Sequence, residues 1–291
     1  LHQGAPLTEE KDGVWGFYRY HLPDPVFFAK AIRVTLQQIA GGNVAQLRAL
    51  MGGIGKGMTL IDTAEMYGDG RSEQLVAKAI EGQRDRIFVV SKVLPGNASR
   101  KGTIKACENS LKNLNTTFID LYLLHWRGTY PLAETFAGFE DLKAAGKIRH
   151  YGVSNFDVDD LDELAAEVPE AQCAANQVQY NLSDRGIEWD LYPRCQKDGV
   201  AMMAYCPLGQ GRLINNAGLG AIAQKHGVTN AAIALAFTLR LPGMISIPKS
   251  SHEKRVLENA AAADIVLDAE DLAALDKLFP PPRKKRSLAM T

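Results

Sequence analysis

The chain has 291 residues, of which 46% are hydrophobic and 23% are charged, values usual for a globular protein. Its 33 Lys and Arg residues balance its 33 Asp and Glu residues, which argues against broad electrostatic binding of nucleic acid or an anionic membrane but permits a local phosphate pocket. No stretch approaches the roughly 20 apolar residues of a membrane span, and the polar, acidic start does not read as a secretory signal.

The N-terminal part of the chain has the least regular pattern. Residues 44–57, VAQLRALMGGIGKG, read as an amphipathic helix that ends at glycine. We expect a strand before this helix within residues 13–30, with GVWGFYRYH as the candidate. Residues 1–43 as a whole follow no clean period, so this segment is predicted to be atypical.

From residue 58 onward, apolar runs alternate with amphipathic runs. Strands are predicted at 58–63, 86–92, 118–125, 148–154, 173–180, 200–205 and 244–250, and helices at 71–82, 102–114, 131–147, 157–168, 187–199, 219–227, 231–241 and 252–261. Continuous apolar strands indicate burial on both faces and therefore a parallel sheet under helices. The segment 280–291, with its basic run, is expected to be a surface tail rather than a nuclear signal.

Two α/β architectures fit this alternation, a closed (β/α)8 TIM barrel and an open doubly wound sheet. No GxGxxG follows a first strand, so the open dinucleotide-binding fold loses support. A barrel needs eight units, and one of them must come from residues 1–56. We therefore predict a single barrel domain over residues 1–291, with an atypical first strand and N-terminal segment.

Polar residues stand at the carboxyl ends of the first three clear strands. They are Asp62, Lys92 and His125, and Tyr67 follows just after the first. In a barrel these strand ends meet at one face. A carboxylate that pairs with an ammonium avoids much of the desolvation cost of either group. A cation beside a phenol favours phenolate and is expected to lower its pKa, which suits proton delivery to an oxygen.

Each of these residues also has an ordinary structural interpretation. Asp62 can cap a turn, Lys92 can lie at the surface, Tyr67 can pack in a loop, and His125 before Trp126 can be a hydrogen-bonded core residue. Four such residues at successive strand ends make a joint structural explanation improbable. The set favours protonation of a carbonyl oxygen, oriented by His125, while a hydride attacks the carbon.

Hydride transfer needs a cofactor, and later segments suit a nicotinamide dinucleotide. Ser154, Asn155 and Gln177 are polar groups able to hold a carboxamide, and Tyr205 offers a ring for stacking. The Gly-rich loop after Tyr205 could cover a pyrophosphate, and a basic helix start could bind phosphate. The further cofactor candidates in these two segments are Pro207, Leu208, Gln210, Gly211, Pro248, Lys249, Ser250, Ser251, Arg255, Glu258 and Asn259.

Seven motifs together resemble the aldo-keto reductase superfamily, from about residue 57 to the C-terminus. They are DTAEMYG, VVSK, LYLLHW, GKIRHYGVSNF, NQVQYN, AYCPLGQG and IPKSSHEKRVLEN. Within the superfamily the chain looks like small bacterial members that reduce methylglyoxal and similar aldehydes. The departure is the N-terminus, where the family's first strand beside the substrate pocket is replaced by an unfamiliar sequence.

The resemblance implies a (β/α)8 barrel and NADPH-dependent reduction of small carbonyl substrates. It makes Tyr67 the general acid, Lys92 the partner of Tyr67, and Asp62 the partner of Lys92. Tyr67, His125 and Trp126 would then contact the substrate. It also implies that Lys249, Ser250 and Arg255 meet the adenosine 2′-phosphate, which favours NADPH over NADH, and that Glu258 and Asn259 contact adenine.

Two other functions remain open at this point. A catalytically weak NADP(H)-binding regulatory module of the same fold would suit the odd N-terminus. A metal-dependent barrel hydrolase would need clustered ligands, and of six histidines His125 alone stands at a strand end, so no metal is expected. The four cysteines form no CxxC pair and suggest reduced thiols in a cytoplasmic protein. A monomer is the family-based expectation.

Overall fold

The computed structural model describes residues 36–37 and 44–290. Its core is one parallel sheet in which the strands lie side by side in chain order. The strands are β1 (Leu36–Gln37), β2 (Leu60–Asp62), β3 (Phe88–Val93), β4 (Ile119–Leu124), β5 (Ile148–Ser154), β6 (Cys173–Gln179), β7 (Ala201–Tyr205) and β8 (Met244–Ser246).

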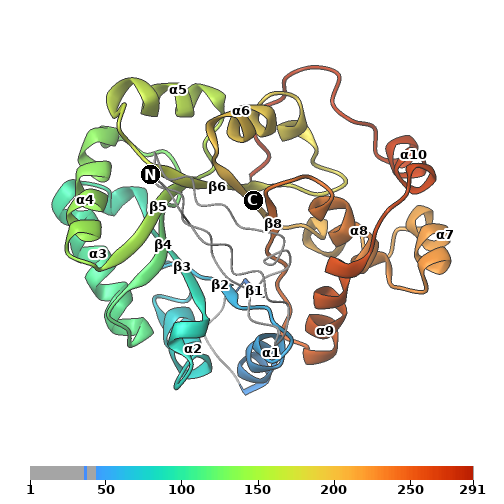
Figure 1. The fold of residues 1–291 in the computed structure, drawn as a ribbon, viewed down its shortest axis with the longest axis horizontal. Helices are drawn as coiled ribbons and strands as arrows, with labels where there is room; N and C mark the ends of the chain where they lie inside the picture. The colour runs from blue at the N-terminus through green and yellow to red at the C-terminus, as the bar shows by residue number, and fades with distance from the viewer. Residues whose placement is uncertain (1–35, 38–43, 291) are drawn as a thin grey trace, which may run out of the picture.

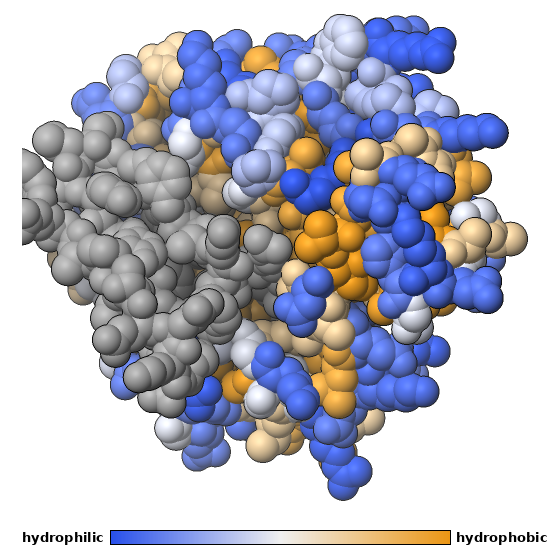
Figure 2. All heavy atoms as spheres, turned by 45° about the vertical axis from the view of Figure 1, so that its right-hand side comes forward, coloured by the Kyte–Doolittle hydropathy of each residue, from blue (hydrophilic) through white to orange (hydrophobic). Residues whose placement is uncertain are grey.

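Helices surround this sheet, as Figure 1 shows. They are α1 (Val44–Ile54), α2 (Arg71–Ala79), α3 (Arg100–Leu114), α4 (Leu132–Ala144), α5 (Val158–Glu167), α6 (Leu191–Asp198), α7 (Ala217–His226), α8 (Asn230–Leu239), α9 (Glu253–Ala261) and α10 (Ala269–Leu278). Figure 2 shows the face that carries the C-terminal helices, where hydrophilic side chains surround a more hydrophobic middle.

Strands β2 to β8 are buried on both faces over most of their length, as their continuous apolar character predicted. Side chains alternate along a strand, so Val90 and Lys92 share the inner face of β3 while Val89 packs outward. The inner apolar cluster also contains Leu60 and Leu121, and the larger outer cluster fills the space between sheet and helices. The inner cluster forms a floor below the carboxyl ends of the strands.

Helices α1 and α9 pack against each other. A Cβ placed on Gly52 of α1 would lie 3.0 Å from Cγ of Glu253. A larger residue at position 52 would therefore press on the start of α9. Within the described residues, the strand pairings run from β1 to β8 and do not include a β8–β1 pair.

Several local expectations differ from the structure. The stretch 13–30 lies outside the described residues, and the strand that pairs with β2 is Leu36–Gln37. The predicted helix 187–199 begins only at Leu191, because 186–188 forms a 3-10 turn and the Asp190 carboxylate accepts a hydrogen bond from the Leu191 amide. Sequence analysis missed α10, whose start is a capping box between Asp268 and Asp271.

The C-terminal segment runs over the surface and contacts the rest of the protein at two points. The Lys285 ammonium lies 3.3 Å from a carboxylate oxygen of Asp159 and 3.8 Å from those of Asp157 and Asp190. Leu288 packs, partly buried, against the outer core cluster. Residues 283–287 are exposed, as expected of a surface tail, and this segment additionally carries a cation that faces an acidic surface and one partly buried apolar side chain.

Below the inner cluster, at the amino ends of the strands, one carboxylate is shared by two arginines. Asp120 is 1% exposed and lies 2.7 Å from a guanidinium nitrogen of both Arg84 and Arg149. It also accepts the Val89 amide at 2.9 Å. The two guanidiniums each lie 4.0 Å from the centre of the Phe118 ring. This cluster ties β3, β4 and β5 together.

Asp120→Ala should therefore destabilise the fold strongly. It leaves the Val89 amide and two cations without their shared acceptor, so the free energy of unfolding should fall by about 3 kcal/mol. Asp141→Ala is the control, because it breaks an exposed pair with Arg100 that should be worth less than about 1 kcal/mol. Urea denaturation of both variants checks this, and equal midpoints would contradict the assigned role of Asp120.

Candidate active site

The carboxyl ends of the strands bring the predicted residues together. Lys92 lies on β3 with its side chain on the inner face, and its ammonium donates to Asp62 Oδ2 at 2.8 Å and to the Thr63 carbonyl oxygen at 2.7 Å. Both side chains of the ion pair have no solvent exposure. The neighbouring Ser91 points the other way, toward the buried carboxylate of Glu73. The alternation of β3 thus selects Lys92 for the inner face.

Tyr67 and His125 complete this group. The loop between β2 and α2 turns sharply through three residues of positive φ, Gly68, Asp69 and Gly70. It places the Tyr67 ring with its centroid 5.0 Å from the Lys92 ammonium. His125 follows β4, and its ring meets Tyr67 edge-on, with centroids 5.7 Å apart. The four predicted catalytic residues therefore lie in one cluster.

Burial and charge act in opposite directions on these groups. Burial alone would lower the pKa of Lys92, but Asp62 and Tyr67 outweigh it and the pKa is raised, so Lys92 is an ammonium. Burial, and secondarily the charge of Lys92, lowers the pKa of His125 to about 3. The imidazole is therefore neutral at physiological pH. No described residue hydrogen-bonds its Nδ1 atom.

The expected direction of the Tyr67 pKa is wrong. Burial raises the pKa of the Tyr67 phenol above its usual value, and the nearby Lys92 opposes this shift without reversing it. The negative charge of Asp62 adds to the increase. The sequence reveals the cation but not the depth of burial, so it predicted the smaller of the two effects. Tyr67 is consequently a protonated phenol at neutral pH.

The residues predicted to hold a carboxamide bond to one another and to the ion pair. Gln177 Nε2 donates to Asp62 Oδ1 at 2.7 Å, which joins β6 to β2 across the sheet. Ser154 Oγ donates to the backbone oxygen of Gln177 at 2.8 Å. Gln177 therefore supports the ion pair directly, a contact that sequence analysis did not foresee.

Asn155 continues this network toward β7. It has a left-handed backbone, with φ of 58°, and its Nδ2 donates to the His125 carbonyl oxygen at 3.1 Å and to Ser154 Oγ at 3.2 Å. The Tyr205 hydroxyl donates to Asn155 Oδ1 at 2.8 Å. The predicted stacking residue is thus held by the predicted amide-binding residue. Together with Trp126, whose ring centroid lies 4.9 Å from that of His125, these residues form one continuous polar wall.

A separate cavity of about 250 Å³ opens beside α9. Its lining places the Lys249 and Arg255 cations with the hydroxyls of Ser250 and Ser251 at the amino end of that helix. The amino end of a helix and basic side chains both favour anions. Seven predicted cofactor residues line the cavity: Leu208, Lys249, Ser250, Ser251, Arg255, Glu258 and Asn259.

Other predicted cofactor residues lie nearby but outside this lining. Pro207, Gln210 and Gly211 belong to the loop after β7, where Gln210 has a φ of 55°, and Pro248 is buried after β8. Sequence analysis missed Ile214, Thr229, Ala231 and His252, which also line the cavity. Thr229 could have been found from the sequence as the residue that caps α8, where it accepts from the Ala232 amide. The apolar residues Ile214 and Ala231 carry no such sequence signal.

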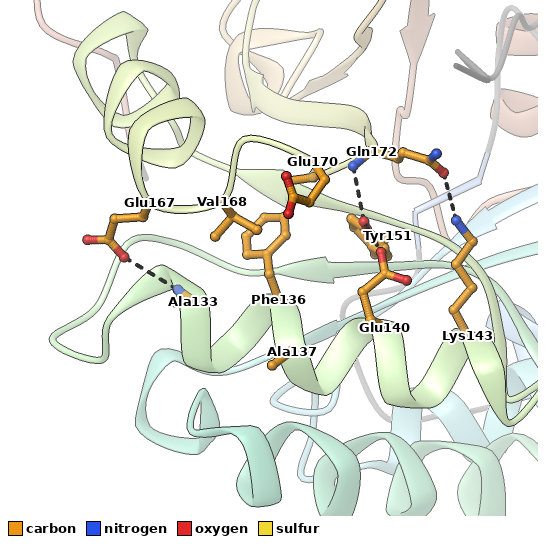
Figure 3. Close-up of a pocket in the computed structure, with 11 residues that line it drawn as sticks. Ala133, Phe136, Ala137, Glu140, Lys143, Tyr151, Glu167, Val168, Glu170 and Gln172 are labelled. Atoms are coloured by element: carbon orange, nitrogen blue, oxygen red, sulfur yellow. Dashed lines mark hydrogen bonds between the residues drawn. The ribbon is translucent and has the colours of Figure 1, made fainter. Parts of the chain in front are cut away.

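A second cavity, of about 450 Å³, lies away from these residues, between α4 and the α5–β6 connection (Figure 3). Its polar groups already pair with one another: Tyr151 donates to Glu140 and accepts the Gln172 amide, and Lys143 donates to Gln172. None of the predicted site residues lines it. We interpret it as a surface hollow of the helix layer.

Comparison with known proteins identifies the fold and its family. Residues 45–279 match the Aldo/keto reductase family. The chain belongs to the aldo/keto reductase family. Methylglyoxal reductase YeaE of Escherichia coli strain K12 is 47% identical to this aldo/keto reductase over 250 residues, which cover 84% of the chain and 88% of the relative. Glyoxal reductase of Bacillus subtilis strain 168 is 35% identical over 241 residues, or 83% and 86% of the two chains.

Solved structures agree with this assignment. A crystal structure of an aldo/keto reductase from Klebsiella pneumoniae in complex with NADP and acetate is 46% identical to this aldo/keto reductase. It superposes with a TM-score of 0.86 and covers 89% of this chain and 95% of the other. The predicted family and the predicted (β/α)8 barrel are thereby confirmed. Among the helices described, none has the length and apolar character that crossing a membrane requires.

The low pKa of His125 leads to a prediction about its titration. In the folded state the imidazole should remain neutral down to about pH 3, whereas an unfolded histidine gains a proton near pH 6.5. The contribution of neutral His125 to stability is therefore present above pH 6.5 and is lost as the pH falls toward 3. NMR of labelled imidazoles, assigned with His125→Gln, should show His125 signals that do not move between pH 8 and 5. A midpoint near 6.5 would contradict the assignment.

Proposed function

We propose that this aldo/keto reductase uses NADPH to reduce small aldehydes and ketones, such as methylglyoxal, to alcohols. The observation that carries the proposal is the cluster in which a buried Asp62–Lys92 pair lies beside a protonated Tyr67 and a neutral His125. The names of the two relatives, a methylglyoxal reductase and a glyoxal reductase, support a small dicarbonyl as substrate.

The residues fit an NADP cofactor. The cavity beside α9 gathers two cations and two hydroxyls at a helix start, which is donor chemistry for a phosphate ester. Lys249, Ser250 and Arg255 would hold the 2′-phosphate, while Glu258 and Asn259 would meet adenine. Ser154, Asn155 and Gln177 would hold the nicotinamide carboxamide, and Tyr205 would stack on its ring. When bound, NADPH supplies the hydride.

The chain's own residues would then orient the substrate and donate the proton. The neutral imidazole of His125 keeps one ring N–H, which can donate to the carbonyl oxygen of the substrate and orient the substrate. Since His125 is uncharged, no charge of its own has to be desolvated when the substrate binds. Tyr67 gives its phenolic proton to that oxygen as negative charge develops there. The adjacent Lys92 ammonium stabilises the phenolate left behind, and Asp62 keeps Lys92 charged in its buried position. Trp126, beside His125, would form part of the substrate pocket.

The remaining expectations are proposed on the same basis. All the site residues above come from one sheet, the loops that follow its strands and helix α9, which supports the proposal that residues 1–291 act as a single barrel domain. A monomer would suffice for the reaction, because no residue in the proposed mechanism must come from a second chain. A cytoplasmic location stays a prediction from the cysteine pattern.

Tyr67→Phe tests the proposed chemistry. The wild-type protein should oxidise NADPH, followed at 340 nm, with methylglyoxal as substrate. Tyr67→Phe removes only the proton donor, so turnover should fall by at least about a hundredfold while NADPH affinity is kept. Tyr192→Phe is the control, since its phenol bonds the Pro242 carbonyl oxygen in the exposed connection before β8. Wild-type NADPH binding without turnover would instead favour a regulatory NADP(H)-binding module.

Arg255→Ala tests the 2′-phosphate assignment. Losing a charge-assisted contact should weaken NADPH binding by about tenfold to a hundredfold and leave NADH binding nearly unchanged. Lys254→Ala removes a neighbouring cation of α9 that is 90% exposed and absent from the cavity lining, so it should affect neither cofactor. Fluorescence titration with both cofactors checks this. Equal losses for NADPH and NADH in Arg255→Ala would refute the assignment.

A further inference from the structure

The loop of residues 63–70, here called the Tyr67 loop, carries the proposed proton donor. The bonds of the Tyr67 backbone stay within the loop and the start of α2, with its amide donating to the Ala64 carbonyl oxygen and its own carbonyl oxygen accepting from Ser72. The neighbouring Met66 is 43% exposed and supplies no anchor. The position of the phenol relative to Lys92 therefore depends on how this loop is attached to β3.

Thr63, at the start of the loop, bonds Val90 and Lys92 of β3, and Glu65 adds the attachment closer in the chain to Tyr67, with both its backbone and its side chain. Its amide donates to the Lys92 carbonyl oxygen at 3.4 Å. Its carboxylate atom Oε1 accepts the Leu94 amide at 2.6 Å and the Asn97 side-chain amide at 3.0 Å. One residue thus spans from the strand position that carries Lys92 to the short 3-10 turn at Pro95–Asn97 that follows β3.

Burying the Glu65 carboxylate is unfavourable, and its two side-chain hydrogen bonds offset part of that cost. Glu65 is partly buried, and burial raises the pKa of its carboxyl group, while the hydrogen bonds from Leu94 and Asn97 oppose that rise. A carboxylate placed there for solubility alone would face the solvent. The Tyr67 phenol itself hydrogen-bonds Lys92 of β3, while the Glu65 bonds hold the backbone of the loop that carries the phenol.

We infer that Glu65 is a positioning residue that sets the Tyr67 phenol against the Lys92 ammonium by tying the Tyr67 loop to the segment after β3. The inference rests on the proposed function. Reacting groups lose rate steeply when displaced, and a shift of about 1 Å can cost on the order of a hundredfold. Glu65 acts only through Tyr67 in this scheme and touches neither substrate nor cofactor.

The test compares four single variants, one of them Tyr67→Phe, and one double variant by NADPH oxidation with methylglyoxal. Glu65→Ala removes both side-chain bonds, so kcat should fall between about tenfold and a hundredfold while the Kd for NADPH stays within about twofold. Glu65→Gln keeps an oxygen acceptor in place and should retain kcat within about threefold. Glu134→Ala is the control, because it deletes an exposed carboxylate that accepts the Arg100 amide at 3.1 Å and should leave kcat unchanged.

The double variant separates positioning from general destabilisation. In a Tyr67→Phe background, adding Glu65→Ala should slow turnover by no more than about twofold, since the donor it positions is already gone. A loss of kcat in the double variant equal to the product of the two single-variant losses would overturn the inference. So would an unchanged kcat in Glu65→Ala, as in the Glu134→Ala control. If Glu65→Ala melts below the assay temperature, Glu65→Asp, one methylene shorter, should still show the kcat loss. A wild-type protein without turnover would overturn the proposed function and this role with it.

Discussion

A lysine ammonium and an aspartate carboxylate meet where no solvent reaches either of them, and the arrangement of the site follows from that pair. Two buried charges are tolerable only when their hydrogen-bonding capacity is met. Lys92 is bonded to Asp62, to the Thr63 carbonyl oxygen and to Tyr67, and the second oxygen of Asp62 accepts from Gln177. Because each atom of the pair has a fixed partner, β2, β3 and β6 cannot shift independently at this level.

The same requirement extends around the sheet. Gln177 is held in turn by the neighbouring strand, through Ser154, and Asn155 connects that strand to His125 and Tyr205. Consecutive strands from β2 to β7 each contribute a group or lead directly into one. A polar wall built this way is ordered before any ligand arrives, so its dipoles need little reorganisation when charge develops on a substrate oxygen. The loops that carry Tyr67 and the cofactor cavity are the parts outside this rigid frame.

Features that recur with each strand of the sheet could be predicted from the sequence, whereas contacts that occur at one place only could not. Asp62, Lys92, His125, Ser154 and Tyr205 were predictable because each ends or nearly ends a parallel strand, a position that the apolar runs mark. The bond between Gln177 and Asp62 was not predictable, because it depends on two side chains crossing the inside of the barrel. The pKa of Tyr67 was predicted with the wrong sign because burial depth has no local signature. Likewise α10 was not predicted, because this short helix has few buried residues and its sequence resembles that of a polar surface segment.

The bond between Gln177 and Asp62 joins residues 115 apart in the chain, unlike the ladder of the sheet, where every strand pairs with its sequence neighbour. A growing sheet can therefore add strands one unit at a time with modest loop-closure entropy, and Asp62 neutralises Lys92 as soon as β2 and β3 pair. The second oxygen of Asp62, however, gains its Gln177 partner only when β6 joins the sheet. Partly assembled chains would leave one acceptor of the buried ion pair without this hydrogen bond, so the polar wall is completed late in folding.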